Sequence, residues 1–176
     1  NYDAAATTLY AMASDEARKG NFDYACTLMS NAMSYVADDS CLESTEWLSF
    51  ESDNYSHKLL NAFGLFYDGC KEEAENILKG LGNVVVNQNF DALYILARCQ
   101  EDRQDWSEMW NTYDNMTEIF LQSRDKGMDS TSFRKFKYRM AILREKLGMG
   151  PGAGIMRELI AENHNYDKYF LQLRWM

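Results

Sequence analysis

The side chains that most often carry out catalysis are few in this 176-residue sequence. Its two histidines are His57 and His164, and the chain contains neither a GxSxG nor an HExxH motif, the patterns of serine hydrolases and zinc proteases. The glycine-rich run 148–154 lacks the lysine of a phosphate-binding loop and follows no predicted strand. The sequence therefore predicts a protein that is not an enzyme, with no catalytic residue and no cofactor.

Metal binding is the second chemistry that cysteine and histidine could support. The four cysteines are Cys26, Cys41, Cys70 and Cys99. No two of them are spaced as CxxC, and neither histidine stands at a zinc-like spacing from them. A free cysteine on a helix behaves as a small hydrophobic residue. We therefore expect reduced cysteines, no metal site and a reducing compartment, the cytoplasm.

The net charge of −9 limits the partners that the chain can bind. Most affinity for nucleic acids comes from basic groups on the phosphate backbone, so an acidic chain without a basic cluster is not expected to bind DNA or RNA directly. No stretch approaches the ~18 apolar residues of a membrane span. The chain begins at Asn1 and ends on the largely apolar Leu173–Met176, so we interpret it as a fragment of a longer protein.

Helices are the elements that must position any binding residues, because apolar side chains recur with helical spacing. One such pattern occurs twice, with a constant offset of 84 residues. Its first copy comprises Leu9, Met12, Ala13, Gly20, Phe22, Ala25, Met29 and Ala32, and its second Leu93, Leu96, Ala97, Gln104, Trp106, Met109, Tyr113 and Met116. Repeated units of this size bury their apolar faces against one another, so we expect them to stack.

The periodicity predicts four helical hairpins in one domain. We expect them at about 4–37, 57–83, 90–122 and 132–163, with an insertion at 38–55 and a terminal helix at 166–176. Gly20 and Gly69 suit the turns, since glycine adopts the left-handed conformation that ends many helices. The spacing predicts that the second turn is two residues shorter than the first. Gly64 is expected where the helices of the second hairpin cross closely.

Two stretches carry a family signature. They are Leu60-x2-Phe63-Gly64-x2-Tyr67 and Gly20-x-Phe22-x2-Ala25-x3-Met29-x2-Ala32, and together they resemble the two helices of a tetratricopeptide repeat. The resemblance implies an all-α fold, a right-handed α-solenoid of about four hairpins plus a terminal helix. The chain departs from the family in its irregular repeat lengths and at Lys71, where the family pattern has an aromatic residue in the turn. A generic helical bundle is the alternative.

In stacked helical hairpins, the first helix of each pair lines the concave surface. The partner-binding positions expected there are Tyr10, Lys58, Asn61, Tyr94, Arg98, Lys135, Tyr138 and Arg139. Tyrosine supplies rigid contact area, and arginine supplies a bidentate fork for carboxylates. These residues predict a groove for an extended or helical acidic peptide. The alternative is that the tyrosines pack between helices while the basic residues pair with Asp68, Glu101 or Asp102.

The insertion at 38–55 combines acidic residues with Trp47, Leu48 and Phe50. It is either a linker whose aromatics cover the edge of an open groove or an element that docks a basic partner. The predicted function is a protein–protein interaction scaffold that binds a peptide or protein segment. The alternatives are a sensor or regulatory domain of a larger signalling or transcription protein, and a self-association module. Lys58 and Asn61 are similar to part of the family's anion clamp, but its other members are not matched.

Overall fold

A computed structural model of the chain describes residues 2–35, 47–87, 89–123, 130–150, 152–162, 173–174 and 176. Every regular element in these ranges is a helix, and none of them is a strand. The predicted all-α fold class is therefore confirmed. None of these helices is long and apolar enough to cross a membrane.

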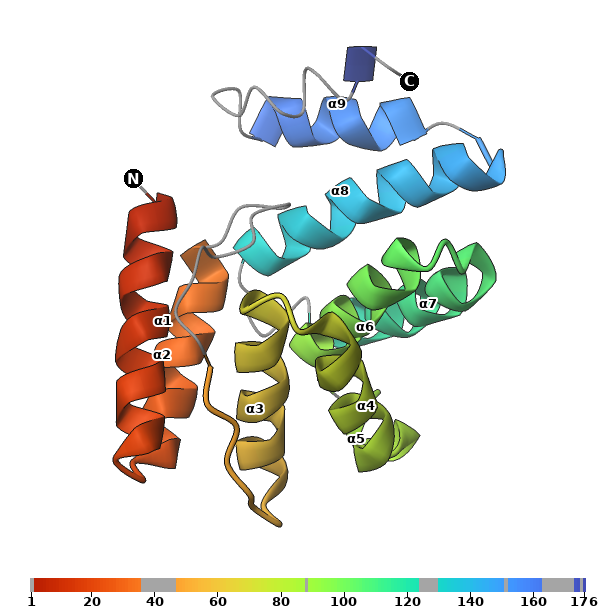
Figure 1. The fold of residues 1–176 in the computed structure, drawn as a ribbon. Helices are drawn as coiled ribbons and strands as arrows, with labels where there is room; N and C mark the ends of the chain where they lie inside the picture. Colours follow the sequence, from red (N-terminus) through yellow and green to blue (C-terminus); the bar gives the residue numbers. More distant parts are fainter. Residues whose placement is uncertain are drawn as a thin grey trace. The chain divides into compact units, whose positions relative to one another are not determined.

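Figure 1 shows the helices of the described residues in chain order. In order they are α1 (Tyr2–Arg18), α2 (Phe22–Tyr35), α3 (Tyr55–Tyr67), α4 (Lys71–Leu81), α5 (Asn83–Val86), α6 (Phe90–Asp102), α7 (Trp106–Ser123), α8 (Ser130–Leu147) and α9 (Gly152–Glu162). The chain divides into two compact units, Asn1–Cys99 and Gln100–Met176, and the boundary falls inside α6. The predicted terminal helix at 166–176 lies largely outside the described residues.

The same turn follows α1, α3, α6 and α8. In each turn one residue has a left-handed backbone: Gly20 (φ 84°), Gly69 (φ 93°), Gln104 (φ 57°) and Gly148 (φ 64°). After α1, the N–H of Asn21 donates to the carbonyl of Glu16 at 2.9 Å, and the N–H of Gly20 donates to that of Ala17 at 3.0 Å. This pair of bonds is the Schellman motif, which satisfies the last carbonyls of a helix.

Gln104 occupies the position that Gly20 holds 84 residues and two hairpins earlier. Its N–H donates to the carbonyl of Glu101 at 2.9 Å, and the N–H of Asp105 donates to that of Gln100 at 2.9 Å. These bonds duplicate those after α1 with an offset of 84 residues, the same offset as the apolar pattern. The sequence repeat is therefore also a repeat of local structure, even where a glutamine replaces the glycine.

The turns after α1 and α3 have equal length, so the prediction of a shorter second turn was wrong. Residues 19–21 separate α1 from α2, and residues 68–70 separate α3 from α4. The difference lies in the helices, because α1 has 17 residues and α3 has 13. Both turns keep the same length because the Schellman bonds require one left-handed residue at a set distance from the last helical turn.

In the first unit, α1 packs on α2, α2 on α3 and α3 on α4. Ala13 of α1 and Ala25 of α2, two small residues of the repeated apolar pattern, are both completely buried. Met29 of α2 is buried as well. Small side chains at such positions let two helices approach closely, and the larger methionine fills the remaining space.

In the second unit, α7 packs on α8 and α8 packs on α9. The run 148–154 is not a turn throughout, because α9 begins at Gly152. A Cβ at Gly152 would collide with the carbonyl oxygen of Ala141 and the side chain of Glu145. This glycine therefore allows the start of α9 to approach α8. Leu173 and Met176 pack against the core that Tyr138 and Met156 help to form.

Candidate functional site

The eight residues predicted to contact a partner differ in exposure. Six have buried side chains: Tyr10, Asn61, Tyr94, Arg98, Tyr138 and Arg139. Lys58 is partly exposed, and the side chain of Lys135 lies outside the described residues. The six buried side chains contact other parts of the chain, so they do not present an open groove to solvent.

Two buried arginines make contacts within their own units. Arg139 donates from one terminal nitrogen to both carboxylate oxygens of Glu101, at 2.9 and 3.0 Å. Arg98 donates to the hydroxyl of Tyr94 at 3.4 Å, and its guanidinium lies 5.9 Å from the centre of the Phe66 ring. The Arg139 contact is one of the pairings that the sequence left open as an alternative. Charge pairing and a cation–π contact thus hold these two arginines.

Tyr10 and Asn61 both contact the non-helical segment 47–54. The contacts of this segment also show its direction relative to α3. Trp47 lies near the end of that helix, Phe50 beside its middle at Asn61, and Ser52 beside its start at His57. The segment therefore runs antiparallel to α3, and Figure 1 shows it as an orange trace beside that helix. The remainder of the predicted insertion, through residue 46, lies outside the described residues.

Asn61 contacts the segment through its entire side-chain amide. Its Nδ2 donates to the carbonyl of Phe50 at 2.6 Å, and its Oδ1 accepts from the N–H of Phe50 at 3.3 Å. The same oxygen accepts from the indole Nε1 of Trp47 at 3.1 Å. A buried amide must satisfy its donors and acceptors. Here one asparagine on α3 pairs with both backbone groups of a residue in an irregular segment.

The indole of Trp47 is 4 % exposed and lies against Gly64 of α3. A Cβ at Gly64 would come closer than 3 Å to three indole atoms. The ring also lies 5.9 Å from that of Tyr10, and the backbone N–H of Trp47 donates to Asp68 at 3.3 Å. Gly64 was predicted to allow close helix crossing, but the group that approaches it is this tryptophan.

The hydroxyl of Tyr10 joins α1 to α3 at the same place. It donates to the carbonyl of Gly64 at 2.9 Å. Burial, with smaller contributions from Asp68 and Cys70, raises the pKa of Tyr10 well above its ordinary value. The hydroxyl therefore stays protonated and keeps donating to Gly64 beside the indole.

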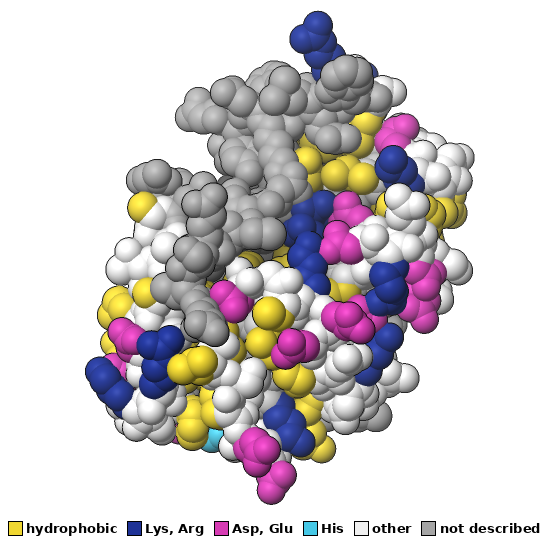
Figure 2. Space-filling model, in the orientation of Figure 1, with side chains coloured by type: hydrophobic (Ala, Val, Ile, Leu, Met, Phe, Trp, Pro, Cys, Tyr) yellow, Lys and Arg dark blue, Asp and Glu magenta, His cyan; other side chains and the backbone are white. Residues whose placement is uncertain are grey.

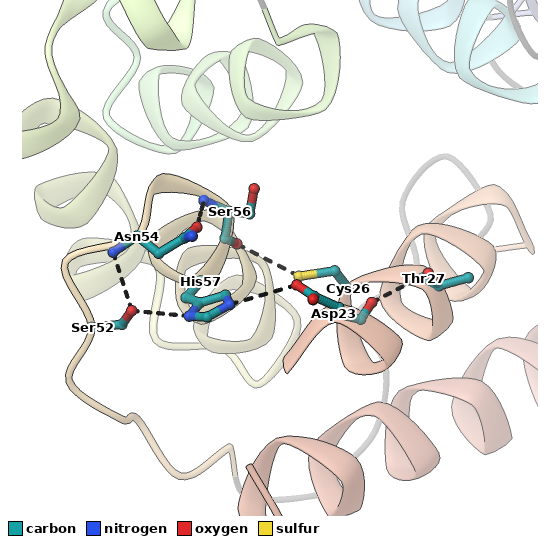
Figure 3. Close-up of polar contacts among 7 residues, drawn as sticks. All are labelled: Asp23, Cys26, Thr27, Ser52, Asn54, Ser56 and His57. Carbon is teal, nitrogen blue, oxygen red and sulfur yellow. Dashed lines mark hydrogen bonds and ion pairs between the residues drawn. The ribbon is translucent and has the colours of Figure 1, made fainter. Parts of the chain in front are cut away.

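The other end of the segment is held by aromatic stacking and by polar contacts, of which Figure 3 shows the polar ones. The ring of Phe50 stacks on that of Phe22 with centroids 4.3 Å apart, and the ring of His57 lies 4.6 Å from Phe22. The side chain of Asn54 accepts from the N–H of Ser56 at 2.9 Å and thereby caps α3. This cap determines where the segment ends and the helix begins.

Ser52, His57 and Asp23 are the residue types of a hydrolase triad, and Figure 3 shows them in line. Ser52 Oγ lies 3.0 Å from Nδ1 of His57, and Nε2 lies 3.7 Å from Asp23. A hydrolase uses the opposite ring nitrogens and a buried carboxylate, whereas Asp23 is fully exposed. Ser52 Oγ also accepts from the N–H of Asn54 at 3.1 Å. These contacts hold the end of segment 47–54 against α2 and α3.

Neither the charges on the face that Figure 2 shows nor the metal-ligand residue types of the described residues point to another site. Figure 2 shows acidic and basic side chains interspersed on the face in view, not gathered by sign. Within the described residues, no three histidine, cysteine or carboxylate side chains stand close enough to hold a metal ion. The contacts around Asn61 and Gly64 therefore form the candidate site.

The sequence prediction identified Tyr10 and Asn61 of this site but did not join Trp47 and Phe50 to them. The available signal was Gly64, a glycine inside an otherwise apolar helix, which indicates that something approaches the backbone there. Comparison with protein-family models, curated proteins and solved structures finds no match to this chain. What the site does must therefore follow from its own geometry.

Proposed function

We propose that this chain is a protein-interaction module, a divergent member of the tetratricopeptide repeat family, which binds an extended peptide beside α3. The hairpins would stack as a right-handed solenoid, a proposal supported by the turn that recurs after α1, α3, α6 and α8. The single observation that carries the binding proposal is the pairing of the Asn61 amide with both backbone groups of Phe50.

Contacts to a peptide backbone do not depend on the side chain of the residue bound. An asparagine that both donates to a carbonyl and accepts from the N–H of the same residue selects an extended chain. Selectivity then comes from the space beside Gly64, which the missing Cβ of that glycine leaves open to a flat aromatic ring. Preformed helices on both sides lower the ordering cost of association.

This proposal changes the expected chemistry of the partner. The sequence favoured an acidic peptide held by arginine and lysine. The contacts around segment 47–54 instead involve the Asn61 amide, the Asp68 carboxylate and aromatic rings. We therefore propose that the module recognises backbone and aromatic groups, with charge in a lesser role.

A peptide titration tests the proposal. The probe is an acetylated and amidated synthetic peptide with the sequence of residues 45–54, added to the full chain carrying Trp47→Ala, and heat is measured by calorimetry. We expect saturable binding of one peptide per chain. Adding Asn61→Ala should weaken binding at least 10-fold, while Asn31→Ala, at an exposed position of α2, should leave it unchanged. Absence of binding to a folded Trp47→Ala chain would refute the proposal.

A further inference from the structure

We infer that segment 47–54 is a resident ligand of this site and that a partner must displace it. The partner is an extended peptide in which a tryptophan is followed three residues later by an aromatic residue. The inference rests on the proposed function, because it names the ligand of the same site. The partner would present to α3 the groups that Trp47 and Phe50 present now.

The segment is bound through one side only, as a peptide ligand is. Trp47 is buried, while Phe50 and Ser52 are partly buried. Leu48 is 53 % exposed and Glu51 is also exposed. An incoming chain therefore has to reproduce only the inward groups.

The helical framework is adapted to an indole at this place. Gly64 lies in the interior of α3, where glycine is a poor helix former compared with alanine. Its absent side chain provides the space in which Trp47 lies, and Asn61 supplies an acceptor for the indole N–H. Tryptophan is the aromatic residue that has both the flat ring and this donor. The framework thus specifies tryptophan more closely than phenylalanine.

The second aromatic group of the partner follows from Phe50. Its backbone is held by Asn61, while its ring stacks on Phe22 of α2. The same residue therefore receives both the backbone contacts and a ring contact. A partner that places its aromatic residue at another distance from tryptophan would lose one of these two sets. The spacing between the two aromatic residues is accordingly a feature that the site can select.

Competition between the resident segment and the partner has a measurable consequence. A segment in the same chain has a high effective concentration, of the order of millimolar for short flexible connections. The apparent dissociation constant of a partner is the intrinsic value divided by the fraction of molecules with the site open. Removing the Trp47 side chain should raise that fraction. The intact chain should therefore bind the partner more weakly than a Trp47→Ala variant does.

The test compares two peptides on three forms of the full chain by calorimetry. The first peptide has the sequence of residues 45–54, and the second has one alanine inserted between Leu48 and Ser49, which shifts the aromatic spacing. We expect the first peptide to bind Trp47→Ala at least 10-fold more tightly than wild type. It should bind the double variant Trp47→Ala/Gly64→Ala at least 10-fold more weakly than Trp47→Ala, because the added methyl occupies the indole space. The second peptide should bind Trp47→Ala at least 10-fold more weakly than the first.

A second readout follows Trp47 directly in the wild-type chain. Its indole N–H proton resonance, assigned by its loss in Trp47→Phe, should move toward the value of a solvent-exposed indole as peptide saturates the site. If Trp47→Ala does not fold, as judged by circular dichroism, Trp47→Phe replaces it, and tighter peptide binding than wild type is again expected.

The outcomes separate this inference from the proposed function. Equal affinities for wild type and Trp47→Ala, with the Trp47 resonance unmoved, would overturn displacement while leaving peptide binding intact. Equal affinities for the two peptides would overturn the stated aromatic spacing. No binding to any folded form would refute the proposed function itself. A wild-type dimer in sedimentation that Trp47→Ala abolishes would identify a second copy as the occupant and overturn the assignment to a separate peptide.

Discussion

Gly64→Ala is the substitution for which local helix propensity and the tertiary structure predict opposite results. Alanine is favoured over glycine in a helix interior by about 1 kcal/mol, and Gly64 lies inside α3. Judged from the helix alone, the variant should be more stable. The Cβ would, however, lie within 3 Å of three atoms of the Trp47 indole, a contact that folded proteins do not tolerate.

The expected magnitude follows from the position of the ring. Trp47 is 4 % exposed, and emptying a site that holds a buried tryptophan costs ~3–5 kcal/mol. Subtracting the helix gain of ~1 kcal/mol leaves a net loss of ~2–4 kcal/mol in the free energy of unfolding of the first unit. A loss of ~2 kcal/mol lowers the melting temperature of a domain of about this size by at least ~8 °C.

Urea unfolding followed by circular dichroism, together with tryptophan fluorescence, measures this effect. Gly80→Ala is the matched control, since Gly80 lies in α4 and a Cβ added to it would have no atom within 4 Å. It should be neutral or stabilising by up to ~1 kcal/mol. If Gly64→Ala proves as stable as Gly80→Ala, the packing of Trp47 against α3 is refuted, and the candidate site with it.

Three further variants probe other contacts. Tyr10→Phe should cost ~1 kcal/mol at neutral pH through the lost hydrogen bond. Burial raises the pKa of Tyr10 in the folded chain. The contribution of its protonated hydroxyl to the free energy of unfolding is therefore complete below pH ~10 and declines as the pH rises further. The free energy of unfolding of Tyr10→Phe, measured in urea, should accordingly depend less on pH above ~10 than that of wild type. Glu101→Gln should cost ~3 kcal/mol in chemical denaturation, since it leaves the charge of Arg139 buried without its carboxylate partner. Gln104→Gly should raise the melting temperature through relief of ~1 kcal/mol of left-handed strain.

Two of these variants have a control, and each of the three has a contradicting result. Tyr24→Phe, at a half-exposed ring, should leave the alkaline pH dependence unchanged, and an unaltered slope in Tyr10→Phe would contradict the buried hydroxyl. Asp15→Asn breaks an exposed ion pair with Arg18 and should cost less than ~1 kcal/mol. A similar small cost for Glu101→Gln would contradict a buried pair. A lower melting temperature for Gln104→Gly would contradict the shared turn geometry.

Local structure was predictable to a large extent from the sequence. The apolar repeat with an offset of 84 residues placed Gln104 in register with Gly20, and both residues have the left-handed conformation. Helix periodicity and helix ends depend on hydrogen bonds between residues at most five apart, so short-range patterns contain the necessary information. The equal lengths of the first two turns were missed although they too follow from local hydrogen bonds, because the prediction assigned the extra residues of α1 to the turn. The start of α9 at Gly152 was missed because it depends on the contact of that glycine with α8.

The candidate site could be predicted only in part. Tyr10 and Asn61 were selected as inward residues of two first helices, and the structure brings both to segment 47–54. Nothing in the spacing of Trp47 indicated that its ring would lie on Gly64, 17 positions further along the chain. Likewise, several acidic partners were open to Arg139 until the fold placed Glu101 beside it.

The sequence by itself determined that this chain is helical, where its repeated turns lie and which stripes of its helices turn inward, because each of these depends on neighbours along the chain. The tertiary structure decided which group fills the space that Gly64 leaves and which backbone Asn61 holds. Those contacts join positions far apart in sequence, and they are selected by shape and by hydrogen-bond satisfaction in a close-packed interior.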